Sequence, residues 1–487
     1  MLLPSAPDLF AQLARADAAG RSPLWLASWY GGIPTLAYSV ISGWLMHLVG
    51  VRTVGVVATV VIAERGGRLV EASARPRRAA AALSLAALLN LFSGRVTFAL
   101  GCAALLTTLV ELRENRKVGA LFAGTVSALA APLAGAALVL AALAVGAADR
   151  SRRRLALSVA AAAGLPLLIV AALFPTPTHG SFSAPDLLLC EAVCVVIAGT
   201  TGVRAVRFFA LLLGATALGL FVLPNGMGAV IGRVPMLAAV PLVLATATRR
   251  RARAVTALAV AGLATWPTAS FAADLRPVGD ASATAAYFAP LIAHLPVRID
   301  GRVEVVDTRT HAADAYLADR VALARGWERQ IDVAVNPLFY AGPLSNATYR
   351  AWLDTWAVRY VAVPDDPIDF GYAAEARLVT SGLPYLRLEW VSAHWRLYRV
   401  VTPTPLVGGA RSATLEPDGT VAFTTSTRGT FVVRQRYSRL LALVDATGTA
   451  IAGGVSPDQE GTAVTVPAAG CYRLTAAIDP EPASACT

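Results

Sequence analysis

The sequence predicts an α-helical polytopic membrane domain of about ten spans, followed by an extracytoplasmic α/β domain and a C-terminal β-sandwich. Of the 487 residues, 56% are apolar and only 15% are charged, whereas a soluble domain carries about a quarter of its residues as charge. The net charge of +11 comes entirely from residues 1–275, whose balance is +13, because residues 276–487 have a balance of −2. Basic residues confined to the apolar half are typical of a multi-pass membrane protein and exclude nucleic acid as a partner.

Apolar runs that approach the roughly 20 residues of a membrane span divide the first half of the chain. The first run is interrupted near Gly50 and Arg52. The candidate spans are 34–63, 79–93, 94–112, 118–131, 133–148, 155–174, 184–200, 205–222, 232–247 and 254–272. We therefore expect a transmembrane helical domain over residues 34–273, preceded by an acidic and aromatic outer loop at residues 1–33.

Arginine and lysine mark alternate loops between these runs. Basic clusters lie at 65–78, 113–117, 150–154, 204–207 and 249–253, and the intervening loops are poor in basic residues. Because basic loops stay on the cytoplasmic side of a membrane, we expect the intervening loops to face outward. With an even number of spans, the N-terminal segment and residues 274–487 are then extracytoplasmic.

The C-terminal half changes character after Asp274. Residues 274–402 mix β-like and helix-like runs, which predicts an α/β domain. The β-like runs are Arg302–Val306, Val358–Val363 and Trp395–Val400, and the helix-like runs are Ala312–Arg325 and Asn346–Ala357. Residues 403–487 contain only short alternating runs divided by turn residues, which predicts a β-sandwich. Cys471 and Cys486 flank its last strand, and an oxidising compartment favours a disulfide between them.

The sequence contains no glycine-rich phosphate loop after a predicted strand, so we expect no nucleotide cofactor. A divalent cation is a candidate cofactor, because Asp186 and Glu191, with His179 nearby, offer a second acid or a set of metal ligands. Asp186 follows Pro185 and also fits an ordinary helix cap.

The most informative segments begin at the N-terminus. An acidic stretch runs from Asp8 to Asp17, an aromatic-glycine turn follows at 29–34, and the first apolar run comes next. Further segments are Leu91–Gly101, Leu223–Gly228 with Arg233, Asn336–Tyr340 and His394–Tyr398. Over roughly residues 8–400 the chain resembles bacterial integral membrane proteins of the GT-C type, the polytopic glycosyltransferases.

The resemblance implies sugar transfer at the outer leaflet of a bacterial plasma membrane. The donor would be a polyprenyl-phosphate-linked sugar and the acceptor a cell-envelope glycan or lipid. Family members place an acid in the first outer loop, and the matching positions are Asp8 and Asp17. Nine residues apart on a helix, the two differ by about 180°, so only one can face a site. We favour Asp8 as the catalytic base, although it also fits a helix N-cap, and Asp17 also fits a helix end.

Arg95 and Arg233 stand among apolar residues at the outer ends of predicted spans. A guanidinium in that position usually finds an anion, and the donor phosphate is one candidate. Contact with lipid headgroups is the alternative. The β-sandwich has two interpretations as well, because it fits either a carbohydrate-binding module or a structural cap.

Two rival functions remain open: a transporter or flippase of lipid-linked intermediates, and a non-catalytic membrane scaffold. The family also begins with a span before the acidic loop, whereas here only seven residues precede Asp8. We therefore expect either that the natural chain starts further upstream or that a partner membrane protein supplies the missing helix.

Overall fold

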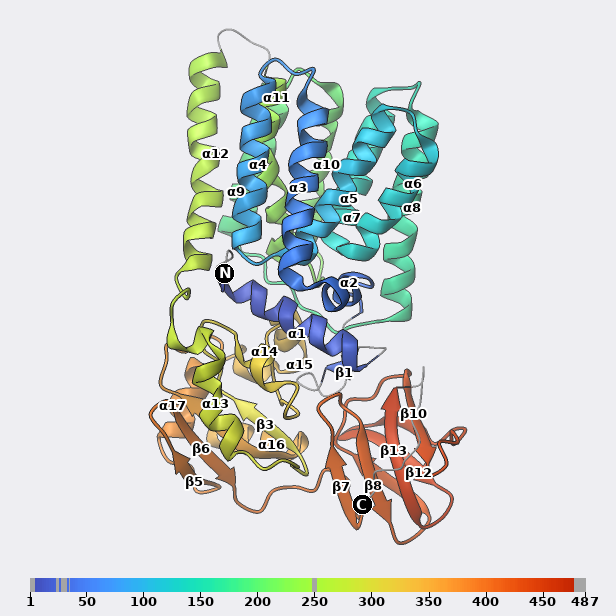
Figure 1. The fold of residues 1–487 in the computed structure, drawn as a ribbon, viewed down its shortest axis with the longest axis vertical. Coiled ribbons are helices and arrows are strands. Elements are labelled where there is room, and N and C mark those ends of the chain that lie inside the picture. Colours follow the sequence, from blue (N-terminus) through green and yellow to red (C-terminus); the bar gives the residue numbers. More distant parts are fainter. Residues whose placement is uncertain (1–4, 23–25, 28–32, 35, 248–251, 477–487) are drawn as a thin grey trace. The chain divides into compact units, whose positions relative to one another are not determined.

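The structure is a computed structural model that describes residues 5–22, 26–27, 33–34, 36–247 and 252–476 (Figure 1). The chain divides into two compact units. The first, which we call the helical unit, comprises residues 1–12 and 36–276; the second, the C-terminal unit, comprises residues 13–35 and 277–487. The expected outer loop at 1–33 is thus divided between the units, and the boundary expected after residue 273 lies at Arg276.

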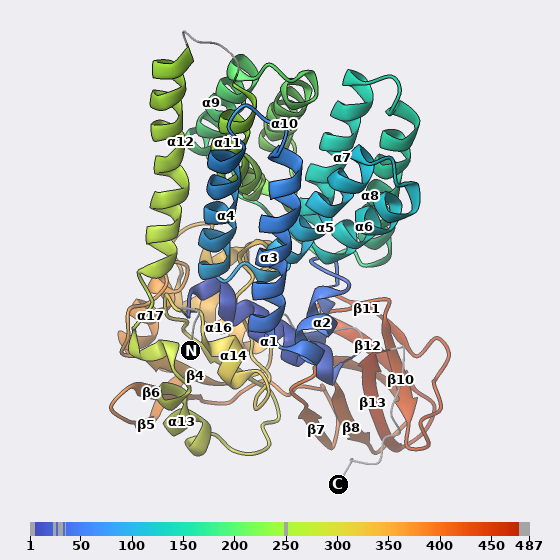
Figure 2. The ribbon, with the colours of Figure 1, turned by 45° about the horizontal axis from the view of Figure 1, so that its top comes forward.

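The helical unit is built from antiparallel helices. Its elements are α1 (Pro7–Arg21, of which residues 7–12 belong here), α2 (Ser42–Val49), α3 (Val51–Val70), α4 (Pro76–Phe92), α5 (Val96–Arg113), α6 (Lys117–Ala130), α7 (Pro132–Ala148), α8 (Arg153–Leu173), α9 (Ala184–Thr200), α10 (Arg204–Val222), η2 (Gly228–Gly232), α11 (Arg233–Thr246) and α12 (Ala252–Leu275). From α3 to α12, successive helices run in opposite directions (Figures 1 and 2). Each of the ten predicted apolar runs overlaps one of them.

Small residues allow these helices to approach closely. A Cβ atom added at Gly101 of α5 would lie 2.7 Å from the Cβ atoms of Ala131 and Ala134. At Gly135 of α7, an added Cβ would lie 2.7 Å from the backbone of Ala128 in α6. Glycine and alanine at helix contacts are typical of helices that associate in lipid.

The expected count of about ten spans is not reached. Among the described residues, four segments are long and apolar enough to cross a membrane: Val96–Arg113, Arg153–Leu173, Arg204–Val222 and Gly228–Thr246. A fifth is counted if α2 and α3, which are bent by 111° at Gly50, form one broken span. Helices α4, α6, α7 and α9 have only 14 to 17 residues, short of the roughly 20 that a span needs.

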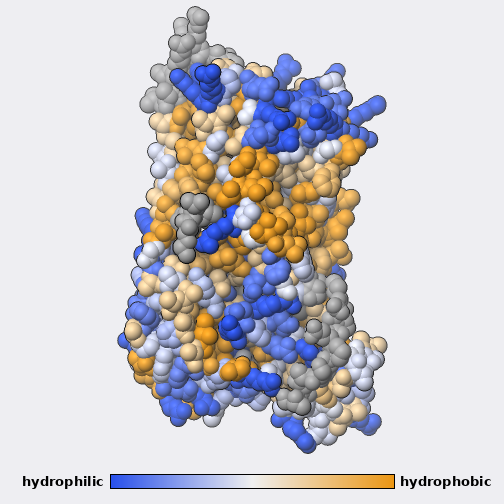
Figure 3. Space-filling model, in the orientation of Figure 1, coloured by the Kyte–Doolittle hydropathy of each residue, from blue (hydrophilic) through white to orange (hydrophobic). Residues whose placement is uncertain are grey.

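The alternating direction brings the basic loops to one end of the helical unit. The loops that follow α3, α5 and α7 carry arginines, and α10, which follows the loop after α9, begins at Arg204. All four connections lie at this end (Figure 1). Figure 3 shows hydrophilic side chains gathered there, and apolar side chains along the sides of the helices. Of the last basic cluster, Arg249, Arg250 and Arg251 lie outside the described residues.

The C-terminal unit begins with an α/β sheet of order β3-β4-β6-β5. Strands β3 and β4 are parallel, and the other two pairs are antiparallel. Its elements are η3 (Ala281–Ala283), α13 (Ala285–His294), β3 (Arg302–Val305), α14 (Ala313–Leu317), α15 (Arg329–Val335), η4 (Pro337–Phe339), α16 (Asn346–Thr355), β4 (Val358–Pro364), α17 (Ala373–Thr380), β5 (Leu386–Val391) and β6 (Trp395–Val400). A two-stranded pair, β1 (Leu26–Ala27) and β2 (Ile33–Pro34), comes from the N-terminal part of the same unit.

The predicted strands match β3, β4 and β6, but the predicted helix over 312–325 is wrong beyond Leu317. The backbone of Val303 in β3 bonds to Ala322 and Ala324, so residues 322–324 run alongside β3 and do not form a helix. Val321 to Ala324 are buried there. Hydrogen bonding to a neighbouring strand has overridden the local helix propensity.

A fully buried arginine, Arg325, organises the core beneath this sheet. Its guanidinium bonds to Glu375 at 2.9 Å and Asp332 at 2.8 Å, and lies 3.6 Å from Glu304. Burial and neighbouring carboxylates raise the pKa of Glu304 well above its ordinary value. One guanidinium facing three carboxyls therefore favours a proton on Glu304.

The chain ends in two small antiparallel sheets, of order β10-β13-β8-β7 and β11-β12-β9. Their strands are β7 (Ser412–Leu415), β8 (Val421–Thr425), β9 (Gly429–Val433), β10 (Leu441–Asp445), β11 (Val455–Asp458), β12 (Gly461–Val466) and β13 (Gly470–Ala476). Phe423, Leu443 and Leu474 are buried. The expected disulfide from Cys471 stays a prediction, because Cys486 lies outside the described residues.

Candidate functional site

An ion cluster in the helical unit begins with the first turn of α1. Pro7 is the first residue of this helix, and Asp8 follows in the first turn, where the helix dipole favours a carboxylate. This turn packs on the connection between α4 and α5. At Gly94, φ is +76°, and an added Cβ would lie 2.4 Å from the backbone nitrogen of Leu9. Only glycine fits both the backbone conformation and the contact, and the next residue is Arg95.

Four charged side chains form this ion cluster: Asp8, Arg95, Arg233 and Asp274. Arg95 donates from Nε to Asp8 Oδ2 at 3.0 Å and from Nη2 to Asp274 Oδ2 at 2.8 Å. Arg233 donates from Nη2 to the same Asp8 oxygen at 3.4 Å. The Arg95 side chain is 10% exposed, and those of the other three are about a quarter exposed.

A second set of polar contacts fixes the elements that carry the cluster. The Asn90 side chain of α4 donates to the backbone oxygen of Arg95 at 3.2 Å. The Thr97 hydroxyl of α5 donates to Gln12 Oε1 of α1 and lies 3.1 Å from the Ser42 hydroxyl of α2. Gln12, Ser42 and Thr97 are all buried. The carboxylate of Asp8 is therefore held by a packed arrangement of four helices.

The cluster is formally neutral, and its two arginines differ. Arg95 is held by short hydrogen bonds to both carboxylates, so its guanidinium has a fixed position in the cluster. Arg233 makes one long hydrogen bond within the described part of the chain, to Asp8. A guanidinium has five donor hydrogens, so Arg233 is the member with the greater capacity to bind an added anion.

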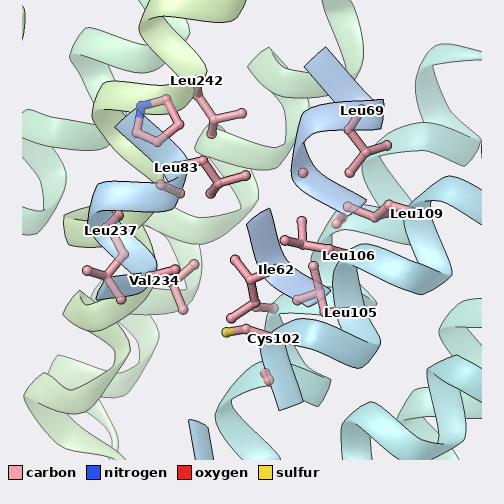
Figure 4. Close-up of a pocket in the computed structure, with 18 of the residues that line it drawn as sticks. Ile62, Leu69, Leu83, Cys102, Leu105, Leu106, Leu109, Val234, Leu237 and Leu242 are labelled. Carbon is pink, nitrogen blue, oxygen red and sulfur yellow. The ribbon is translucent and has the colours of Figure 1, made fainter. Parts of the chain in front are cut away.

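Arg233 also lines an apolar cavity of about 300 Å³ inside the helical unit. The cavity lies between α3, α4, α5, α7, α10 and α11 and is surrounded mainly by aliphatic side chains (Figure 4). Residues labelled there include Ile62, Leu83, Cys102, Leu105, Leu106, Val234, Leu237 and Leu242. Among the described lining residues, Asn90 supplies the one amide side chain and Arg233 the one charge. An apolar cavity with a guanidinium in its wall suits an amphipathic anion.

The structure brings together three of the residues selected from the sequence, Asp8, Arg95 and Arg233. Asp17, the other acid of α1, is not part of the cluster. It forms an ion pair with Arg21 at 2.8 Å and belongs to the C-terminal unit.

The second acidic site is not assembled. Asp186 lies in the first turn of α9, and Ser183 is the N-cap of that helix. The backbone nitrogen of Asp186 donates to the Ser183 hydroxyl at 3.2 Å, and that hydroxyl donates to Asp186 Oδ2 at 2.6 Å. Glu191 lies further along α9, against Gly214 of α10. Within the described residues, no group of three or more His, Cys, Asp or Glu side chains is arranged to hold a metal ion. The set of Asp186, Glu191 and His179 therefore does not form such a group.

Sequence reasoning missed Asp274 as a member of the site. It was used only to mark the end of the apolar half, yet it lies in the last turn of α12 and bonds to Arg95. A lone carboxylate at the end of a 24-residue apolar helix was the available signal, because such a charge needs a partner.

Comparisons with protein-family models, curated proteins and solved structures find no match to this chain, so the site is interpreted from its own geometry.

Proposed function

We propose that this chain is a GT-C-type membrane glycosyltransferase of the bacterial plasma membrane. It transfers a sugar from a polyprenyl-phosphate-linked donor to a cell-envelope glycan or lipid on the outer face. One observation carries the proposal: Arg233 belongs both to the ion cluster and to the wall of the apolar cavity. A ligand that satisfies both surroundings has a long apolar chain and an anionic head, as a polyprenyl phosphate does.

Donor binding follows from the difference between the two arginines. The isoprenoid chain enters the cavity, and the phosphate approaches Arg233, whose 3.4 Å contact with Asp8 is the longest in the cluster. Phosphate is a strong partner for guanidinium, so it competes with Asp8 for Arg233. Once Arg233 turns to the phosphate, Asp8 has lost one neighbouring cation and becomes a stronger base.

The chemistry then needs one base and one stabiliser of the leaving group. Asp8 removes the proton from the acceptor hydroxyl while that oxygen attacks the anomeric carbon of the sugar. The bond between the anomeric carbon and the phosphate oxygen breaks, and the polyprenyl phosphate leaves with the extra negative charge. Arg233 and Arg95 stabilise this charge.

A matched pair of variants tests the assignment, because α1 carries two aspartates. Asp8→Asn keeps the side-chain shape but removes the base, so we expect the rate of sugar transfer to fall roughly 100-fold or more. Asp17→Asn, which alters only an ion pair with Arg21, should leave the rate near normal. Both are measured with the full chain in membranes, using a panel of tritium-labelled polyprenyl-phosphate sugars. Near-normal turnover in Asp8→Asn would contradict the role of Asp8.

One observation favours the transporter as a second candidate. The Oε1 atom of Glu191 is buried in α9 without a hydrogen-bond partner among the described residues, and acids inside apolar helices often carry protons in transporters. Movement of the labelled lipid across the membrane without covalent transfer would support this function instead.

A further inference from the structure

Two His–Asp pairs of the C-terminal unit lie at the end of the α/β sheet where the parallel strands β3 and β4 terminate; we call this end the edge of the sheet. Residues 307–311 follow β3 and residues 365–371 follow β4, and these strands are parallel. Strand β6 is antiparallel to β4, with Trp395 opposite Pro364, so His394 lies at this same edge. Ligands of α/β sheets bind outside the carboxyl ends of the parallel strands.

His311 is held in an unusual conformation at this edge. Its φ angle is +54°, a region that is uncommon for residues other than glycine and costs energy there. Its Nδ1 lies 2.9 Å from Asp307 and its Nε2 lies 3.4 Å from Asp369. The ring stacks on Trp327 with 3.6 Å between centroids. The ring is therefore fixed on both nitrogens and on one face.

An exposed aromatic ring, Phe370, directly follows Asp369, the carboxylate that contacts this histidine. Arg329 donates to Asp369 at 2.7 Å, and its guanidinium carbon lies 4.3 Å from the centroid of the Phe370 ring. Phe370 is 78% exposed. A Cβ added at Gly371 would lie 2.2 Å from Arg329 Nη1, so glycine makes room for the arginine. The result is an aromatic surface in solvent that is positioned by a charged network.

The second pair adds hydrogen-bonding groups. His394 Nδ1 lies 3.2 Å from Asp365, and the Tyr287 hydroxyl donates to the same carboxylate at 2.8 Å. Asp365 and His394 are about half exposed. Tyr287 thus fixes the carboxylate from the protein side while solvent reaches the carboxylate and the imidazole.

We propose that this edge of the α/β sheet is a binding site for a neutral carbohydrate chain. The apolar face of a sugar ring stacks on Phe370, as apolar surfaces do on aromatic rings. The sugar hydroxyls donate to Asp365, exchange hydrogen bonds with His394 and accept hydrogen bonds from Arg329. A few placed polar groups around an apolar surface are what a specific small-ligand site requires.

The charge at the edge favours a neutral ligand. The positive charge of Arg329 is matched by Asp369, which also contacts His311. Asp365 and Asp366 add negative charge beside them. The edge therefore has no excess of cations that would select a phosphate or an acidic polymer.

Carbohydrate binding here does not depend on the proposed transfer reaction. All of its residues belong to the C-terminal unit, whereas Asp8 belongs to the helical unit. The Asp8→Asn variant separates the two proposals. If it binds the carbohydrate but no longer transfers sugar, the carbohydrate site is intact although the transfer reaction is lost.

The test uses the full chain in detergent and a glycan array with neutral oligosaccharides and acidic oligogalacturonates. We expect a neutral glycan to bind, and Phe370→Ala to weaken its affinity about tenfold, as loss of an aromatic contact predicts. The control is Tyr437→Ala, which removes another exposed aromatic ring from the C-terminal unit and should not change the affinity. Unchanged unfolding temperatures would show that both variants fold.

Three outcomes would overturn the proposal. The first is that the wild-type chain binds no neutral glycan, and the second is that it binds only the acidic polymers. The third is that Tyr437→Ala weakens binding as much as Phe370→Ala.

Discussion

Three charged side chains selected from the sequence lie close together in the structure. Arg95 and Arg233 stand out because charge is costly beside a membrane, and Asp8 because the resemblance implies an acid in the first outer loop. The structure places both arginines within hydrogen-bonding distance of Asp8. His311 has no comparable signal, because its sequence neighbours do not reveal Asp369, which lies in a distant loop. Contacts between residues far apart in the chain depend on the fold and have no local sequence signal.

The same histidine predicts a dependence of stability on pH. Burial opposes its charged form, but the hydrogen bonds with Asp307 and Asp369 outweigh this and raise the pKa of His311 to about 9, above its ordinary value of about 6.5. This stabilisation is complete below about pH 6.5 and is lost as the pH rises through about 9. We expect it to be on the order of 3 kcal/mol. The unfolding temperature of the wild-type chain should therefore decrease as the pH rises from about 6.5 to about 9.

The matched comparison for this pH effect uses two histidine variants. His311→Gln should lack most of the decline in unfolding temperature, whereas His294→Gln, which alters an exposed histidine, should retain it. Equal pH profiles for His311→Gln and the wild-type chain would refute the assignment. Thermal unfolding of the full chain in detergent, followed by near-ultraviolet circular dichroism, provides the measurement.

At the scale of elements, composition located the helices well but overestimated the number of membrane spans. Apolar runs predicted each helix from α4 to α12 within about three residues, because a helix ends where its apolar side chains end. The first run, 34–63, corresponds instead to α2 and most of α3, which are divided at Gly50. The number of spans did not follow, since helices such as α6, with 14 residues, are too short by the same rule that predicted them. Strand-like pairing of residues 322–324 was hidden because their partner, Val303, is remote.

The turn between α4 and α5 gives a prediction at this scale. Gly94→Ala would place a Cβ atom 2.4 Å from the backbone nitrogen of Leu9 at a φ of +76°. The conformation alone costs about 1–2 kcal/mol, so we expect the unfolding temperature to fall and sugar transfer to be impaired as Arg95 shifts. Gly67→Ala, where an added Cβ has no neighbour within 4 Å, should be neutral or slightly stabilising. Equal stability of the two variants would contradict this account.

For the whole molecule, the alternation of basic loops predicts an orientation in the membrane. In intact cells, cysteines introduced by Ser181→Cys and Ser345→Cys should react with an impermeant thiol reagent, because both positions are expected outside. Ser73→Cys lies in a basic loop and should react only after permeabilisation. Labelling at position 73 in intact cells would reverse the assigned orientation.

The division into units was only partly visible in the sequence. The composition changes near Asp274, where the apolar half of the sequence ends, and the second boundary between the units lies at Arg276. The first boundary falls inside α1, between Gln12 and Leu13. This boundary lies within one continuous helix, so no turn or loop residue marks it in the sequence.

The position of the ion cluster along the chain has a mechanical consequence. Asp8 precedes the crossing between units at Gln12 by one helical turn, and Asp274 stands two residues before the crossing at Arg276. Both carboxylates are tethered to Arg95. A force that pulls on the C-terminal unit is therefore transmitted along the backbone to these two ion pairs. A ligand that shortens these two ion pairs would increase the force they resist. Tension that breaks them would release Asp8 and Asp274 from their shared arginine.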